Sequence, residues 1–90
     1  MTNSSQFINA TTIITKLNQT PSNDELGQLY GLYKQATLGD NNTDKPSIFD
    51  IKGNKKWSSW LGCKGLSVYN AEVNYIMLVN QLISKYGIKQ

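Results

Sequence analysis

Two residue types that carry much of protein chemistry are almost missing from this chain of 90 residues: it contains no histidine and a single cysteine, Cys63. Without an imidazole there can be no Ser-His-Asp or Cys-His nucleophile site, and no zinc site that needs histidine. One cysteine cannot form a disulfide within the chain, which favours either a reducing compartment or a protein that is indifferent to redox state. We therefore expect a protein that is not an enzyme and that holds no metal or other cofactor.

Arginine and long apolar runs are also missing. The nine basic residues are all lysines, and with six acidic residues they leave a formal charge of +3. Proteins that recognise specific DNA bases usually rely on arginine, whereas lysine supplies a point charge that suits a phosphate. No run approaches the roughly 18 apolar residues of a membrane span, and the N-terminus lacks the pattern of a secretory signal. We expect a soluble, cytoplasmic protein without stable membrane insertion, and this length predicts one domain.

Apolar spacing and turn residues predict four helices. The Ser22-Asn23-Asp24-Glu25 segment reads as a capping box, in which Ser22 accepts the amide of Glu25 and Glu25 reaches back to the amide of Ser22. Both prolines and most glycines fall between the periodic segments. The sequence therefore indicates an all-α bundle. The predicted segments are helices over residues 4–17, 22–38, 54–61 and 67–86, with a long ordered loop over residues 39–52.

Two clusters of residues suggest binding rather than catalysis. Tyr30, Tyr33 and Lys34 stand at i, i+3 and i+4, so two phenols and an ammonium group share one helical face. The segment 52–57 carries three lysines at the start of the third predicted helix, where unpaired amides and a partial positive charge favour an anion. Taken alone, both clusters are explained more simply by half-buried tyrosines and a solvated lysine surface.

Two longer motifs, in order and at the right spacing, make the chain recognisable. Residues 30–40 read Y-G-L-Y-K-Q-A-T-L-G-D and resemble the Y-x-x-Y-K-Q-A-T-x-G-D stretch of the acyl-CoA-binding protein family. Residues 52–60 and 64–67 resemble the family's K-G-x-x-K-W-x-x-W and K-G-x-S segments, and the ending Lys85-Tyr86-Gly87-Ile88 also matches. The resemblance covers nearly the whole chain, although it is weak before Ser22.

The resemblance implies a four-helix, up-down-down-up bundle with a long overhand loop between the second and third helices, forming one acyl-CoA-binding domain over residues 1–90. It also implies a monomeric, non-catalytic intracellular carrier that binds medium- and long-chain fatty acyl-CoA thioesters, buffers their pool and delivers them to lipid metabolism. The implied ligand contacts are Tyr30, Tyr33 and Lys34 at the adenine and 3′-phosphate end, Lys56 at that phosphate with Lys52 nearby, and Tyr75 against the nucleotide and the start of the acyl chain.

Two positions depart from the family pattern. Thr15 stands where many members carry a lysine that assists at the phosphate, and the neighbouring Lys16 points about 100° away around the helix. We therefore expect weaker headgroup binding than is usual in the family. Leu26 and Gly27 occupy the place of two bulky apolar residues beside the acyl chain. Because Gly27 removes one wall of that groove, the preferred chain length stays open.

Two other functions stay open on the residues alone. A basic, aromatic helical module could bind nucleic acid, although a charge of only +3 and the lack of arginine argue against it. Such a module could instead receive a helix of a protein partner on its aromatic face. For Trp57 and Trp60 we expect packing roles, and for Cys63 an inert thiol, since no general base accompanies it.

Overall fold

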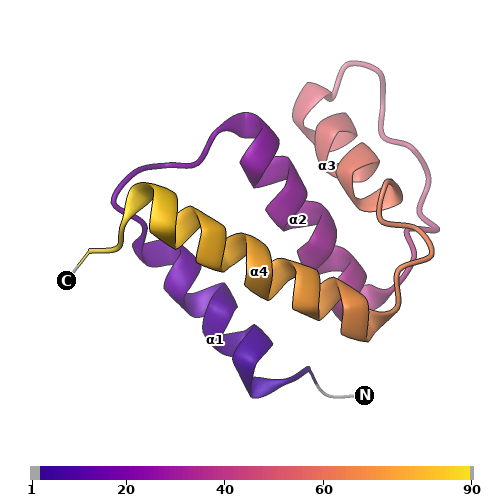
Figure 1. Ribbon diagram of the computed structural model, residues 1–90. Helices are drawn as coiled ribbons and strands as arrows, with labels where there is room; N and C mark the ends of the chain where they lie inside the picture. Colours follow the sequence, from indigo (N-terminus) through magenta and orange to yellow (C-terminus); the bar gives the residue numbers. More distant parts are fainter. Residues whose placement is uncertain (1–2, 90) are drawn as a thin grey trace.

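The structure, a computed structural model, describes residues 3–89 and contains four α-helices (Figure 1). Helices α2 and α3 run in the same direction, and α1 and α4 run opposite to them, which confirms the predicted up-down-down-up order. Within residues 3–89 the β pairing is limited to an isolated antiparallel bridge between Leu17 and Ile88. The elements are α1 (Ser5–Ile13), the 3₁₀ turn η1 (Ile14–Lys16), α2 (Asn23–Leu38), α3 (Ile51–Leu61) and α4 (Val68–Tyr86).

Side-chain caps decide where the helices begin. The capping box is confirmed: Ser22 Oγ accepts the Glu25 amide at 3.2 Å, and Glu25 Oε1 accepts the Ser22 amide at 2.8 Å. The predicted start of the third helix is wrong. Asp50 accepts the Gly53 amide at 2.9 Å, so α3 begins at Ile51 and the overhand loop spans residues 39–50.

The first helix is shorter than its apolar spacing predicts. Helix α1 ends at Ile13 and tightens into η1, which ends before Leu17. This stretch is rich in β-branched residues, which lose rotamer freedom in a helix. In addition, the Thr15 hydroxyl donates to the Thr12 carbonyl at 2.6 Å, a local bond that competes with the regular helical pattern.

The core lies where α1, α2 and α4 meet, and α3 packs on the outer side of α2. Helix α3 contributes a single buried residue, Trp60, whereas α4 contributes five. The position of α3 therefore depends on contacts other than a broad apolar face. The buried core residues are Phe7, Ala10, Leu17, Leu29, Ala36, Ala71, Tyr75, Val79 and Leu82.

Backbone approach and indole hydrogen bonds hold α3 against α2. A Cβ on Gly31 would overlap the backbone carbonyl of Ser59, so the two helices touch at this glycine. Trp60 is buried as expected, and its Nε1 donates to the Gly39 carbonyl at 2.7 Å. Trp57 is half-buried and its Nε1 donates to the Thr43 carbonyl at 3.0 Å. Both indoles thereby fasten α3 to the segment that follows α2.

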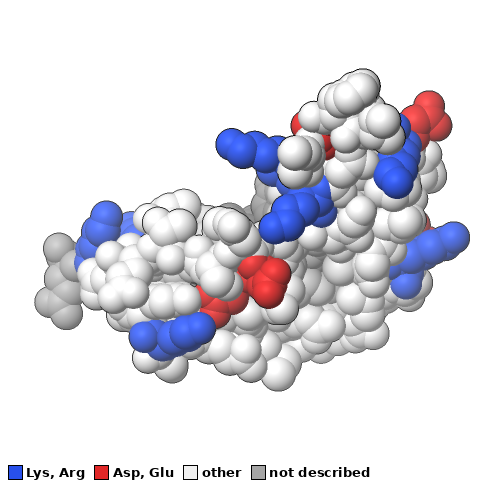
Figure 2. Space-filling view, turned by 90° about the horizontal axis from the view of Figure 1, so that it is seen from above, with Lys and Arg blue, Asp and Glu red and all other residues white. Residues whose placement is uncertain are grey.

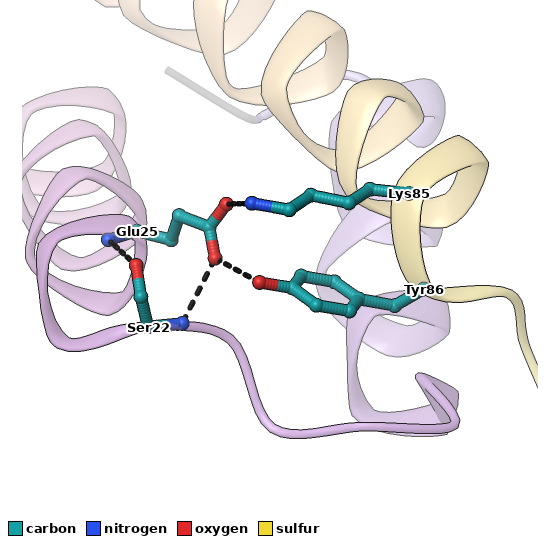
Figure 3. A network of polar contacts seen from close by, with 4 residues as sticks. All are labelled: Ser22, Glu25, Lys85 and Tyr86. Carbon is teal, nitrogen blue, oxygen red and sulfur yellow. Dashed lines mark hydrogen bonds and ion pairs between the residues drawn. The ribbon is translucent and has the colours of Figure 1, made fainter.

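A polar network joins the start of α2 to the end of α4 (Figure 3). Glu25 Oε1 accepts the Tyr86 hydroxyl at 2.6 Å, and Glu25 Oε2 pairs with Lys85 Nζ at 2.9 Å. The Tyr86 hydrogen bond, followed by the Lys85 ammonium, lowers the pKa of Glu25 to about 2. The capping box and the contact between helices therefore share one carboxylate.

Candidate functional site

A groove of about 1150 Å³ opens between α2 and α3. Figure 2 shows the molecule hollowed beside the part formed by α3 and its preceding loop, with blue side chains gathered there and red ones across the hollow. The two helices, which run in the same direction, line it from opposite sides. The lining residues are Asn23, Asp24, Leu26, Gly27, Gln28, Tyr30, Leu32, Ile51, Lys52, Lys55, Lys56, Ser58, Ser59, Gly62 and Cys63.

Two lysines from different helices converge on the ring of Tyr30. Lys34 Nζ of α2 lies 5.9 Å from the ring centroid, and Lys56 Nζ of α3 lies 5.5 Å from it. Lys34 Nζ also lies 5.0 Å from the Trp60 ring. Aromatic faces stabilise cations at these distances, and the two ammonium groups concentrate positive charge beside one ring.

A smaller hollow of about 280 Å³ also borders Tyr30 and lies between η1, α2 and α4. Tyr30 and Leu26 line both hollows, so the two spaces share a wall. Tyr33 and Tyr75 line the smaller one, with ring centroids 6.3 Å apart. Phe7 packs edge-on against Tyr75 at 5.1 Å. The smaller hollow thus offers aromatic surfaces rather than charges.

Burial and a neighbouring phenol make Tyr75 a poor acid. The residue is only 4% exposed, and this burial, together with Tyr33, raises the pKa of Tyr75 to about 12. Tyr33, in contrast, is 41% exposed. Tyr75 therefore stays a neutral aromatic surface at any physiological pH, whereas the ring of Tyr33 is open to a partner.

The six predicted site residues fall into three groups. Tyr30, Lys52 and Lys56 line the groove, and Tyr33 and Tyr75 line the smaller hollow together with Tyr30. Lys34 lines neither space and reaches the Tyr30 ring beside Trp60. Tyr30 thus links the two spaces: it shares the groove with Lys52 and Lys56, and the smaller hollow with Tyr33 and Tyr75.

The expected anion site at the amides of the third helix is wrong in detail. The Asp50 carboxylate already accepts the Gly53 amide at 2.9 Å, so this end of α3 carries its own negative cap. The positive groups that remain near α3 are the side chains of Lys52, Lys55 and Lys56, all of which are exposed and line the groove.

The sequence patterns did not place Ser59 or Cys63 at the groove, which these residues line from α3 and from the turn after it. The spacing of Gly27 and Gly31 could have predicted the contact between α2 and α3. Glycines four residues apart lie on one helical face, and another helix can approach closely there. The Cys63 thiol lies 3.6 Å from the Ser59 carbonyl, and burial raises the pKa of Cys63. This agrees with the expected inert thiol.

Comparison with known proteins identifies the family. The acyl-CoA-binding protein family model matches residues 4–79. The chain belongs to this family. Acyl-CoA-binding protein homolog 1 of Caenorhabditis elegans is 52% identical over 81 residues, which cover 90% of this chain and 94% of that protein. The acyl-CoA-binding protein of Saccharomyces cerevisiae is 53% identical over 74 residues, covering 82% and 85% of the two chains.

Solved structures of acyl-CoA-binding proteins share the fold. The crystal structure of Oryza sativa acyl-CoA-binding protein 2 superposes with a TM-score of 0.86 at 39% identity, over 89% of this chain and 87% of that one. The solution structure of the yeast protein superposes with a TM-score of 0.73 at 49% identity, over 93% and 98%. The all-α, four-helix fold predicted from the motifs is confirmed.

Two other kinds of feature are absent from the described residues: groups of side chains that could hold a metal ion, and helices that could cross a membrane. Across residues 3–89, no group of three or more histidine, cysteine, aspartate or glutamate side chains is placed to hold a metal ion. In the same part of the chain, every helix is too short or too polar to cross a membrane.

Proposed function

We propose that this protein binds one fatty acyl-CoA thioester per monomer, as a single domain of residues 1–90, and carries it in the cytoplasm without chemical change. The observation that carries the proposal is the convergence of Lys34 and Lys56 on Tyr30 beside a groove of about 1150 Å³. That volume matches or exceeds the roughly 300–1,000 Å³ of typical small-molecule sites. Family membership supports the same class of ligand.

The nucleotide end is assigned to the residues around Tyr30. A phosphate monoester carries a charge of about −1.5 to −2 near neutral pH, and each charge-assisted hydrogen bond contributes about 1.5–3 kcal/mol. Lys34 and Lys56 hold the 3′-phosphate, with Lys52 in support. The rings of Tyr30 and Tyr33 stack on the adenine, an interaction that alanine substitution values at about 1–3 kcal/mol per base. Tyr75 packs behind them.

The acyl chain is assigned to the groove. Leu26 and Ile51 supply apolar walls from α2 and α3, and Gly27 leaves the wall between them low. Each methylene removed from water contributes roughly 0.8 kcal/mol, so ten buried methylenes contribute on the order of 8 kcal/mol. The acyl chain therefore accounts for most of the difference in binding free energy between acyl-CoA and free coenzyme A, while the lysines fix the orientation of the ligand. Thr15, exposed beside the smaller hollow, adds no positive charge to the phosphate site.

The protein holds a reactive thioester without attacking it. The chain has no imidazole, and the raised pKa of Cys63 keeps its thiol protonated beside the groove. Binding of nucleic acid is not part of the proposal, since the net charge is only +3 and no arginine reads bases.

Isothermal titration calorimetry with palmitoyl-CoA and with its 3′-dephospho form tests the proposal. We expect the dephospho ligand to bind about tenfold to hundredfold more weakly, which corresponds to one charged hydrogen bond. Lys34→Ala should cause a similar loss with palmitoyl-CoA. Lys89→Ala, in the C-terminal segment after α4, is the matched control and should leave affinity unchanged. If neither ligand bound, the proposed function would be refuted. If both bound with equal affinity, the assignment of the lysines to the 3′-phosphate would be refuted.

A further inference from the structure

The turn that leads into α3 and the first residue of that helix carry the three most exposed large apolar side chains of the described residues. Ile48 is 79% exposed, Phe49 88% and Ile51 76%. Ile48 and Phe49 occupy the two central positions of a turn closed by the Asp50 amide, which donates to the Ser47 carbonyl at 2.9 Å. Central turn positions usually hold Gly, Pro, Asn, Asp or Ser. An Ile-Phe pair placed there contributes nothing to the core and is presented to the outside.

Hydrogen bonds on its polar side hold this turn in shape. The Ser47 hydroxyl accepts the Phe49 amide at 3.2 Å, and the Ser47 carbonyl also accepts Asn54 Nδ2 at 2.7 Å. The Asp50 cap joins the same turn to the first turn of α3. The apolar tip is therefore preorganised, so little conformational entropy is lost when a partner covers it.

Lysines border the apolar tip on both sides. Lys45 precedes it, and Lys52 and Lys55 follow it on α3; Figure 2 shows basic side chains around this part of the molecule. The acidic neighbours are Asp44 and Asp50, so three lysines stand against two carboxylates. The charge around the tip is thus positive on balance.

We propose that this tip, residues 45–52 with Lys55, docks the protein reversibly on anionic phospholipid bilayers. Ile48 and Phe49 enter the boundary between headgroups and acyl chains, and the lysines contact the anionic headgroups. A convex tip with two central side chains offers far less than the roughly 800 Å² per partner of a stable protein interface. Insertion into a fluid bilayer has no such requirement.

The tip also borders the mouth of the groove. Ile51, Lys52 and Lys55 belong to both, so a docked molecule would hold the groove against the headgroup region. This placement suits transfer of a lipid ligand between groove and bilayer. Docking itself requires only the tip, so it is tested on protein free of ligand and stands or falls independently of the proposed function.

Co-sedimentation with vesicles of phosphatidylcholine, with and without phosphatidylserine, tests the proposal. Phe49→Ser should lower partition onto phosphatidylserine vesicles at least fivefold. Tyr69→Ser is the matched control, because Tyr69 is 71% exposed in the first turn of α4, and it should leave partition unchanged. Lys45→Gln should lower partition about fivefold, as expected for one basic residue at an anionic surface, whereas Lys89→Gln should not.

Thermal unfolding of each variant checks that the exposed substitutions leave the fold intact. Loss of binding above about 0.5 M salt, where screening is strong, would support the lysine contacts. Three results would overturn the proposal: no binding to phosphatidylserine vesicles, equal binding to pure phosphatidylcholine, or equal losses in Phe49→Ser and Tyr69→Ser.

Discussion

Two glycines in α2 should respond in opposite directions to the same substitution. Gly27 and Gly31 are four residues apart and face Ser59 of α3. A Cβ at Gly31 would overlap the Ser59 carbonyl oxygen and stand 2.8 Å from its carbon, so the α3 backbone would have to move. A Cβ at Gly27 would meet only Ser59 Oγ, at 3.0 Å, and that hydroxyl can rotate away.

The magnitudes follow from packing and helix propensity. Alanine is favoured over glycine within a helix by about 1 kcal/mol. Gly27→Ala should therefore stabilise the fold by up to about 1 kcal/mol. Overpacking against a fixed neighbour costs typically 1–3 kcal/mol, occasionally more, and the neighbour of Gly31 is backbone. Because backbone cannot move aside easily, we take the upper end of that range, and after the gain in propensity we expect Gly31→Ala to lower the free energy of unfolding by about 2 kcal/mol.

Urea unfolding followed by circular dichroism measures both effects, and thermal unfolding gives a second reading. A loss of about 2 kcal/mol corresponds to a fall in Tm of roughly 8–16 °C for a domain of this size. Because Lys56 is carried on α3, Gly31→Ala should also weaken palmitoyl-CoA binding. The reasoning would be refuted if Gly31→Ala were as stable as the parent or more stable, or if both alanines shifted stability equally.

Three further outcomes can be checked with simple assays. Because the folded pKa of Glu25 is about 2 against an ordinary 4.5, its contribution to stability is complete above pH 4.5 and is lost as the pH falls towards 2. Glu25→Gln should therefore show a shallower fall of Tm between pH 5 and 2. The Cys63 thiol should react with iodoacetamide at pH 8 more slowly than free cysteine, and 8 M urea should abolish the difference. Asn41→Ala should destabilise the fold by about 1–3 kcal/mol, since the buried Asn41 amide donates to the Trp57 carbonyl at 3.1 Å; an unchanged urea midpoint would contradict this.

The parts of the fold that sequence patterns predict well are those with local causes. The bounds of α2 and α4 follow from the Ser22 and Ser67 caps and from Gly39 and Gly87, both at positive φ. The sequence pattern predicts the start of α3 too late because Gly53 has a low helix propensity. In the structure, the amide of this glycine donates to the capping carboxylate of Asp50. A Cβ there would overlap the Asp50 carboxylate as it is placed, so the glycine fits this cap and lies inside the helix rather than before it.

The site is less local, and periodicity alone could not assemble it. Tyr30 and Lys34 share a helical face by spacing, but the approach of Lys56 depends on how α3 lies against α2. Helix α3 buries one residue, so no apolar stripe predicts that packing. Only the resemblance of whole motifs brought Lys56 and Tyr75 into the predicted site, and their contacts with a ligand remain predictions.

The structure gives a physical reason why the motif after Tyr30 extends so far beyond any residue that faces the groove. Gln35, fully buried, donates through Nε2 to Asp40 Oδ1 at 2.8 Å and to the Leu66 carbonyl at 2.9 Å. Asp40 Oδ1 also accepts the Gly65 amide at 2.9 Å, which lowers the pKa of Asp40. These bonds tie the end of α2 to the turn between α3 and α4, while Trp60 ties α3 to Gly39. The two motifs therefore fix the distance between α2 and α3, and with it the meeting of the two lysines at Tyr30.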